Sequence, residues 1–282
     1  MEFWLLPSRA RLDAALPEFG RVFARAKALP STDRGLDAAL RNWGMPENTP
    51  WAAMLAGATE PEAYTHDWLV ADLVSMHAEA NTARILGLAA YSLSAEACEA
   101  LGAAVKPWLR DEGFLMRGCG PGRWLLRCPA GMPSPETVSL DSALGVDLRE
   151  ISPRVPAWQR RNNELQIVLT QQTLNQSRLA QGAPAFNALW VWGFGRLQSP
   201  PKLRFRSLAS QDPALHALAR FTQLEMLELA AQSGSKMLRD FRDAADLTTA
   251  WAQGLRPTHA ELRLADGSGF LARPYDALRF WR

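Results

Sequence analysis

The residues best suited to chemistry lie in the stretch 163–196. Asn175, Arg178 and Asn187 supply two amides and one guanidinium within a short span. A guanidinium binds a phosphate or carboxylate through two parallel hydrogen bonds, so these side chains could converge on an anion. The same residues also suit local structure, because Asn side chains satisfy loop backbone and Arg178 can pair with an acid such as Glu164. Both interpretations stay open from the sequence.

Two predicted elements position these side chains. Apolar residues recur at helical spacing over 158–169, and 188–192 is a short apolar run rich in strand-forming residues. Gly193 and Gly195 are expected to turn the chain as it leaves that strand. The carboxyl end of a strand is where ligands usually bind in an open α/β sheet. The candidate ligand-binding residues are therefore Asn175, Arg178, Asn187, Trp190, Trp192, Gly193 and Gly195.

Residues that bind metals are few and dispersed. A two-metal phosphoryl-transfer site needs Asp and His ligands from several strand ends. The chain has four histidines, none of them at metal-ligand spacing: His66, His77, His216 and His259. We interpret His216 and His259 as structural. No metal ligand and no cofactor are predicted.

Motifs for nucleophilic catalysis are absent from the sequence. There is neither a G-x-S-x-G elbow nor a P-loop, and Gly193-Phe194-Gly195 is too short for a dinucleotide fingerprint. Cys119 lies in the glycine-rich stretch GCGPG, whose amides could lower the pKa of its thiol, although most such cysteines have no special role. The carboxylates at 240, 243 and 246 are interpreted as a solvated helix face with an N-cap. No catalytic residue is assigned.

Composition narrows the class of protein. The hydrophobic fraction is 48% and the charged fraction 21%, as in globular proteins. The net charge of +2 is too near neutral to suggest a nucleic-acid or membrane partner. Three cysteines without metal-ligand spacing fit a reduced, cytoplasmic chain. No signal peptide is recognised at the start, and no apolar run approaches the roughly 18 residues of a membrane span.

The element pattern predicts an α/β fold with a mixed core sheet and flanking helices. Residues 2–6 form the first strand, and a helical stretch over 10–29 is broken near Pro17. Strands at 68–77, 84–88, 114–116 and 124–128, with a helix capped by Ser94, form a smaller α/β lobe. Residues 129–156 are a linker or an ordered crossing loop.

The C-terminal third is expected to return to the core. Helices are predicted to start at Asp212, Ser235 and Asp246, and a hairpin turns at Asp266–Gly267. We therefore expect three parts. They are 1–64 as the N-terminal part of the core, 65–130 as the small lobe, and 131–282 as the linker, the return helix and strand, and the rest of the core.

Several separated motifs resemble the RpfE-type regulatory proteins of proteobacteria. They are L-N-x-x-R from Leu174, G-x-P-x-x-N from Gly182, W-x-W-G-x-G from Trp190, the stretches 71–77 and 93–97, the strand 123–127 and the terminal LRFWR. That family is similar to the archaeal-type, cofactor-independent phosphoglycerate mutases, which carry comparable N-x-x-R, P-A-N and R-G-A-G sequences.

The resemblance implies a phosphoglycerate-mutase-like scaffold of the alkaline phosphatase type, degenerate at its metal site. The mutases hold two divalent metals through an Asp-Gly-rich start and later Asp and His ligands. This chain starts MEFWLLPSRAR, and it has Trp192 where the mutases have Arg in R-G-A-G. The implied function is a cytoplasmic regulatory or accessory pseudoenzyme, acting through an unknown protein partner or a small phosphorylated ligand.

Two alternatives remain. The first is a divergent phosphoglycerate mutase or phosphomonoester hydrolase, which would bind Mn, Zn or Mg and turn over a phosphate ester. The second, less favoured, is nucleic-acid binding through Lys202, Arg204 and Arg206, with Phe205 among them, on a strand that tracks phosphates. Nucleic acid and membranes are otherwise not expected as partners.

Overall fold

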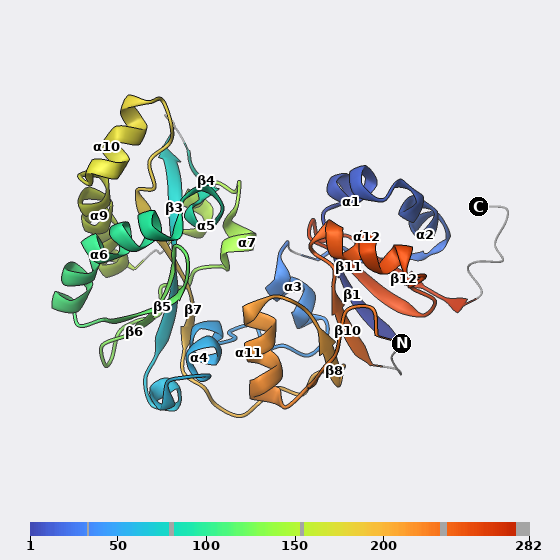
Figure 1. The fold of residues 1–282 in the computed structure, drawn as a ribbon. Coiled ribbons are helices and arrows are strands. Elements are labelled where there is room, and N and C mark those ends of the chain that lie inside the picture. Colours follow the sequence, from blue (N-terminus) through green and yellow to red (C-terminus); the bar gives the residue numbers. More distant parts are fainter. Residues whose placement is uncertain (33, 79–81, 153–154, 232–235, 275–282) are drawn as a thin grey trace. The chain divides into compact units, whose positions relative to one another are not determined.

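The chain consists of two compact units in a computed structural model (Figure 1). The structure describes residues 1–32, 34–78, 82–152, 155–231 and 236–274, apart from the side chains of residues 78, 90 and 91. Unit 1 comprises Met1–Glu47 and Ser199–Arg282, and unit 2 comprises Asn48–Gln198. Unit 2 is therefore inserted into the sequence of unit 1.

Unit 1 is built on a mixed sheet in the strand order β2-β12-β11-β1-β10-β8-β9. Strand β1 pairs in parallel with β10 and β11, and β10 with β8, whereas β12 runs antiparallel to β11. The strands are β1 (Glu2–Leu6), β2 (Lys27–Leu29), β8 (Ser207–Ala209), β9 (Glu225–Met226), β10 (Met237–Asp240), β11 (Ala260–Leu264) and β12 (Gly269–Ala272). The predicted α/β fold with a mixed sheet is confirmed.

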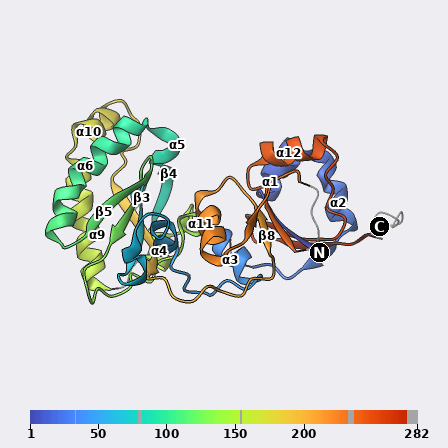
Figure 2. The same cartoon turned by 60° about the horizontal axis from the view of Figure 1, so that its bottom comes forward.

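Helices lie on both faces of this sheet (Figure 2). Trp4 and Leu6 share a core with Phe19 on one face, and Phe3 packs on Trp43 and Phe205 on the other. The described helices of unit 1 are α1 (Arg9–Ala15), η1 (Pro17–Phe19), α2 (Gly20–Arg25), α3 (Leu36–Arg41), α11 (Pro213–Thr222) and α12 (Ala244–Ala252). The predicted break at Pro17 is confirmed.

The C-terminal predictions had mixed outcomes. Asp212 caps α11, and the hairpin at Asp266–Gly267 joins β11 to β12, as expected. Helix α12 starts earlier than Asp246, because Asp243 accepts a hydrogen bond from Ala245 and caps it. The predicted helix start at Ser235 lies outside the described residues. The stretch that should continue that helix is the buried strand β10, because residues 237–240 pair in parallel with β1 and β8.

Unit 2 is built on an antiparallel sheet. Its order is β4-β3-β6-β5, and β7 pairs with β3. Every described pairing among these strands is antiparallel. The strands are β3 (Trp68–Ala78), β4 (Ala83–Leu88), β5 (Leu115–Gly120), β6 (Arg123–Arg127) and β7 (Ala188–Gly195).

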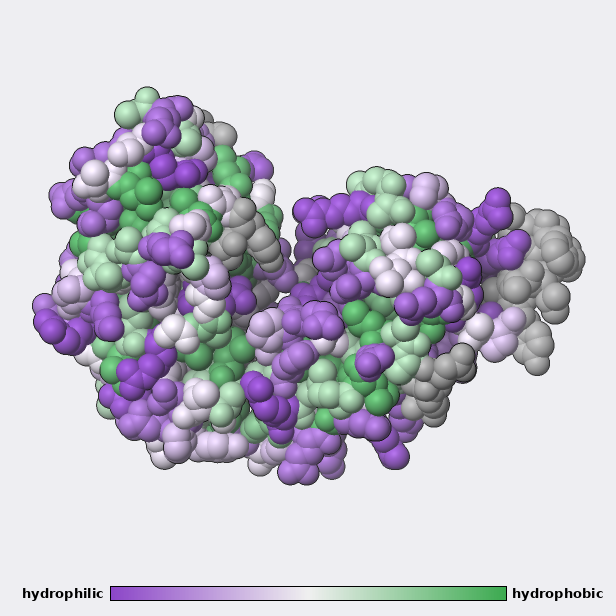
Figure 3. All heavy atoms as spheres, in the orientation of Figure 1, coloured by the Kyte–Doolittle hydropathy of each residue, from purple (hydrophilic) through white to green (hydrophobic). Residues whose placement is uncertain are grey.

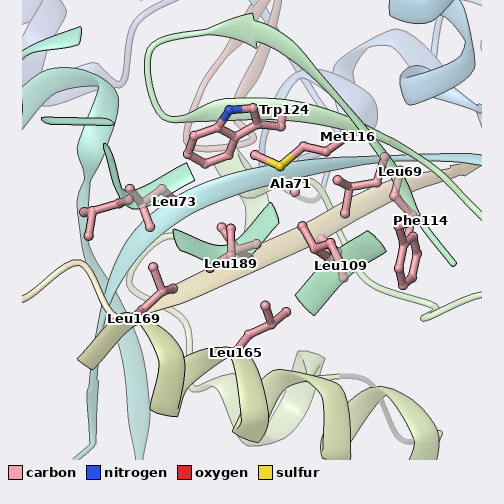
Figure 4. Packing of buried hydrophobic residues seen from close by; sticks show 14 of the residues in the cluster. Leu69, Ala71, Leu73, Leu109, Phe114, Met116, Trp124, Leu165, Leu169 and Leu189 are labelled. Atoms are coloured by element: carbon pink, nitrogen blue, oxygen red, sulfur yellow. The ribbon is translucent and has the colours of Figure 1, made fainter. Parts of the chain in front are cut away.

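The core of unit 2 lies between this sheet and the helices α6 and α9. Figure 4 shows Leu165 and Leu169 of α9 facing Leu189 of β7, with Leu109 of α6 beside them. Figure 3 shows hydrophilic residues spread over the visible face of each unit. The helices are α4 (Trp51–Ala56), η2 (Pro61–Tyr64), α5 (Ala89–Ser92), α6 (Ala95–Asp111), α7 (Leu140–Ala143), α8 (Leu148–Ile151), α9 (Pro156–Thr170) and α10 (Thr173–Ala180). Ser94 caps α6 as expected.

Unit 2 is larger than the expected lobe of residues 65–130. Strand β7 belongs to it because residues 188–195 pair with β3 along most of the register from Trp68 to Val74. Helix α4 belongs to it because an added Cβ at Gly193 would lie 3.0 Å from the Cβ of Trp51. Helix α4, before residue 65, and strand β7, after residue 130, therefore belong to the same unit as residues 65–130, because they contact one another and β3.

The stretch 129–156 is an ordered segment in its described part. Trp158 Nε1 donates to the Pro133 carbonyl at 2.9 Å, and Thr137 Oγ1 donates to the Val191 carbonyl at 2.5 Å. Helices α7 and α8 follow this extended stretch. The segment therefore lies along the edge of β7, where the Thr137 hydroxyl satisfies the Val191 carbonyl.

Candidate functional site

The Asn175 side chain binds backbone groups of two separate segments. Its side chain is fully buried, with 0% exposure. The amide nitrogen donates to the carbonyls of Leu169 and Phe186, both at 2.8 Å, and the amide oxygen accepts from the Phe186 N–H at 2.9 Å. Asn175 thereby joins the end of α9 to the residues that lead into β7.

Arg178 and Asn187 also bind backbone. Arg178 Nε donates to the Pro184 carbonyl at 2.9 Å, and its guanidinium lies 5.0 Å from the ring centre of Phe186. Asn187 accepts from the Met76 N–H at 2.8 Å and donates to the Met76 carbonyl at 3.0 Å. Asn175 and Arg178 thus meet on the segment 184–186, while Asn187 faces β3. These contacts favour the interpretation as local structure over an anion site.

The two tryptophans of β7 point to different partners. Trp190 Nε1 donates to the Val138 carbonyl at 3.1 Å, in the segment along the edge of β7. Trp192 Nε1 donates to Asp72 Oδ2 at 2.7 Å. Both indoles are nearly buried, so each N–H needs the acceptor that it has.

The expected turn at Gly193 and Gly195 is wrong, because β7 continues through both glycines. Gly193 has φ 68° and Gly195 φ 134°, a region that other residues rarely adopt. An added Cβ at Gly195 would lie 3.1 Å from the Cβ of Pro50. The glycines therefore let β7 pack closely on the start of unit 2. Since β7 is antiparallel to β3, the rule for ligands at parallel strand ends does not apply to it.

A cluster around Asp72 was missed by the sequence reasoning. Asp72 is 5% exposed, and its carboxylate accepts from Arg123 Nε at 2.5 Å and from Arg123 Nη2 at 3.2 Å, besides the Trp192 N–H. The signal available was a single Asp inside an apolar strand, since such a buried charge requires a partner. Burial raises the pKa of the neighbouring Cys119 thiol, with Arg123 opposing and Asp72 adding to the shift. The suggested lowering of that pKa by amides is therefore wrong.

A second cluster lies where the parallel strands β8 and β10 of unit 1 end. Arg242 donates from Nε to Asp240 Oδ1 and from Nη2 to Asp240 Oδ2, both at 2.8 Å. The same Nη2 donates to Asp212 Oδ2 at 2.6 Å. Ser210 Oγ donates to Asp240 Oδ2 at 2.8 Å and accepts from the Asp212 N–H at 2.9 Å. One guanidinium therefore bridges two carboxylates at a parallel strand edge.

The pKa values of Asp240 and Asp246 are shifted in opposite directions. Burial raises the pKa of Asp240, but the hydrogen bonds and charge of Arg242, together with Ser210, outweigh it and hold the pKa below its ordinary value. Burial raises the pKa of Asp246, and the negative charges of Asp243 and Asp240 raise it further. Asp240 therefore stays ionised beside Arg242. The interpretation of these acids as one solvated face is wrong for Asp240, which is 7% exposed.

His216 lies beside this second cluster, through the backbone of Ser210. His216 Nε2 lies 2.6 Å from the Ser210 carbonyl and donates to it, which fits the expected structural role. Among the described residues, no group of three or more His, Cys, Asp or Glu could hold a metal ion. No helix in the described part of the chain is long and apolar enough to cross a membrane.

The basic stretch 202–206 is not a strand, because β8 begins only at Ser207. Arg204 donates to the Asn42 carbonyl at 3.2 Å, and its guanidinium lies 5.2 Å from the ring centre of Phe3. Phe205 is 1% exposed and belongs to the core. These contacts do not favour the alternative of a basic strand with a stacking aromatic, because Phe205 is buried and Arg204 binds the chain's own backbone.

Comparison with known proteins gave similarities to solved structures. No protein-family model and no curated protein matches the chain. It is similar to the PH0037 protein from Pyrococcus horikoshii, with 10% identity and a TM-score of 0.42 over 98% of this chain and 89% of that one. It is also similar to the cofactor-independent phosphoglycerate mutase from Thermoplasma acidophilum DSM 1728, with 14% identity and a TM-score of 0.34 over 96% and 88%. Scores this low assign neither a fold family nor an activity to the protein.

Proposed function

We propose that the protein is a cytoplasmic regulatory or accessory pseudoenzyme, in which an ion pair of its own side chains fills the edge where an α/β enzyme would bind its ligand. The observation that supports this is the position of Arg242 between Asp240 and Asp212. The RpfE-type sequence motifs support the regulatory part of the proposal.

The physical argument concerns competition for the carboxylates. A catalytic metal pair needs carboxylate oxygens that are free to bind divalent ions. Both oxygens of Asp240 already accept from Arg242, and one accepts from Ser210 as well. A metal ion at this edge would have to displace a guanidinium that is bound through charge-assisted hydrogen bonds. Metal-dependent chemistry is therefore disfavoured at the cluster with the most suitable acids.

The direct test combines metal analysis with an activity assay. The full chain is dialysed against Mn²⁺, Zn²⁺ or Mg²⁺ and freed of excess ion. Bound metal is then measured beside phosphoglycerate interconversion and hydrolysis of p-nitrophenyl phosphate. We expect no stoichiometric metal and no turnover above that of Asp240→Asn. Stoichiometric metal that Asp240→Asn abolishes, together with turnover, would overturn the proposal and establish the divergent mutase or phosphohydrolase instead.

A further inference from the structure

A groove of about 350 Å³ lies in unit 1, lined by residues that precede β8 and by residues at the end of α11. Helix α11 lies beside β8 (Figures 1 and 2). Four of the lining residues are apolar, namely Pro201, Leu203, Phe205 and Leu224. A binding site for a small molecule has this size and such apolar walls, together with a few polar groups that fix the orientation of the ligand.

Arg206 is the charged residue that lines the groove. Its backbone is fixed, because its N–H donates to the Lys236 carbonyl at 2.7 Å and its carbonyl accepts from the Glu225 N–H at 3.3 Å. Its guanidinium forms no hydrogen bond or ion pair within the described part of the chain, Glu225 included. Arg242, in contrast, binds two carboxylates. An unpaired guanidinium beside apolar walls suits a carboxylate that is carried on an apolar body.

Gln223 lines the same groove in a backbone conformation that glycine adopts more readily. It ends α11 with φ 56° and ψ 39°, in the left-handed region. Its N–H donates to the carbonyls of Ala219 and Arg220, whereas its side-chain amide has no partner among the described residues. Glycine would end the helix at a lower conformational cost, so the retained side chain points to a use for its amide. That amide can give a carboxylate a donor besides those of Arg206.

The carbonyls at the end of α11 are already occupied. Thr222 Oγ1 donates to the Leu218 carbonyl at 2.7 Å, and the Leu224 N–H donates to the Ala219 carbonyl at 2.9 Å. These hydrogen bonds reduce the negative potential that a helix carries at its C-terminal end. The groove can therefore accept an anion beside Arg206.

We propose that this groove binds a small amphipathic carboxylate. The apolar body of the ligand packs on Leu203 and Phe205, and its carboxylate accepts from Arg206 and Gln223. The groove lies at the C-terminal end of α11, whereas the Asp240 cluster lies at the N-terminal end, where Asp212 caps the helix. The proposal therefore does not rest on the proposed function, and either can fail without the other.

The first test is calorimetric titration of the full chain with phenylpropionate. Its neutral amide has the same apolar body without the charge, and acetate has the charge without the body, so both should bind roughly tenfold more weakly or not at all. Arg206→Met should weaken phenylpropionate binding roughly tenfold, because it removes the charge-assisted hydrogen bonds. Arg220→Met is the matched control, since Arg220 is exposed on α11 and does not line the groove. It should leave the affinity unchanged. Wild type that does not bind phenylpropionate, equal affinity for the amide, or an equal loss in both variants would overturn the proposal.

The second test uses Gln223→Gly, which relieves the left-handed backbone and removes the amide. Its melting temperature should rise by roughly 2 °C, while its affinity for phenylpropionate should fall severalfold. A residue with only a structural role would change stability without changing binding. Phenylpropionate binding as tight as that of wild type would therefore overturn the proposal. Arg206→Met should melt at the wild-type temperature, which shows that its loss of binding is not a loss of folding.

Discussion

Each unit contains a carboxylate that accepts from one tryptophan and one arginine, and the two differ in which charge is buried. In unit 1, Glu2 accepts from Trp4 Nε1 at 2.7 Å and from Arg239 at 3.0 Å. In unit 2, Asp72 accepts from Trp192 Nε1 at 2.7 Å and from Arg123 at 2.5 Å.

The burial of the two pairs is reversed. The Arg239 side chain is 1% exposed against 20% for Glu2, whereas Arg123 is 33% exposed against 7% for Asp72. Arg239 also donates to the carbonyls of Leu229 and Ala231, so it anchors a loop as well as its partner. A carboxylate, an arginine and a tryptophan therefore neutralise a buried cation in unit 1 and a buried anion in unit 2. The costly substitution in each is the one that removes the counter-charge of the buried group.

The largest effect is expected from Glu2→Gln. It removes the counter-charge of Arg239, which cannot reach water, and should lower the free energy of unfolding by about 3 kcal/mol. Urea denaturation measures this, with the exposed Glu18→Gln as control. A loss as small as that of the control would mean that the loop carbonyls alone suffice for Arg239, and the comparison would fail in unit 1.

Arg123→Met should come next. It leaves the Asp72 carboxylate with the Trp192 N–H among its described partners, at a cost of about 2–3 kcal/mol in unfolding free energy at neutral pH. Arg110→Met, at an exposed pair with Asp111, is the control and should be near neutral. If both variants unfold at the same urea concentration, burial of the anion in unit 2 has no energetic consequence.

Asp240→Asn extends the comparison to a third pair, with Arg242, and should cost about 2 kcal/mol at neutral pH. The folded pKa of Asp240 lies below its ordinary value, so its stabilisation is present above that value and is lost as the pH falls. The acid side of the stability curve should therefore be shallower in Asp240→Asn than in wild type. Curves of equal slope would show that Asp240 does not contribute to acid unfolding.

The smallest effect concerns the tryptophan hydrogen bonds. Double-mutant cycles that pair Trp4→Phe with Glu2→Gln, and Trp192→Phe with Asp72→Asn, should give coupling energies of about 1 kcal/mol each. The two values should agree, because both N–H groups lie 2.7 Å from their carboxylate oxygens. Unequal couplings would show that the tryptophans, as well as the charges, are used differently in the two units.

Local features were predictable from the sequence because they depend on neighbouring residues. Ser94 and Asp212 cap their helices through hydrogen bonds to backbone two or three residues on. Asp266–Gly267 forms the expected hairpin for the same reason. The strand leading to Trp192 was also recognised, from its apolar run.

Features that depend on distant pairing were not predictable. Nothing near Gly193 shows that the strand continues antiparallel beside β3, and this pairing decides both the extent of unit 2 and the character of the strand end. The Asp72 cluster joins three strands through residues 51 and 120 positions apart. The Arg242 bridge escaped notice because its second acid, Asp212, is 30 positions away.

The two ends of unit 2 meet within the unit itself, since Pro50 touches the position of Gly195. On the other side, an added Cβ at Gly44 would lie 2.4 Å from the Lys202 carbonyl oxygen, so the interrupted chain of unit 1 also meets itself. Entry and exit are thus adjacent in both pieces. A chain in which Glu47 is joined directly to Ser199 would therefore test whether unit 1 folds without unit 2.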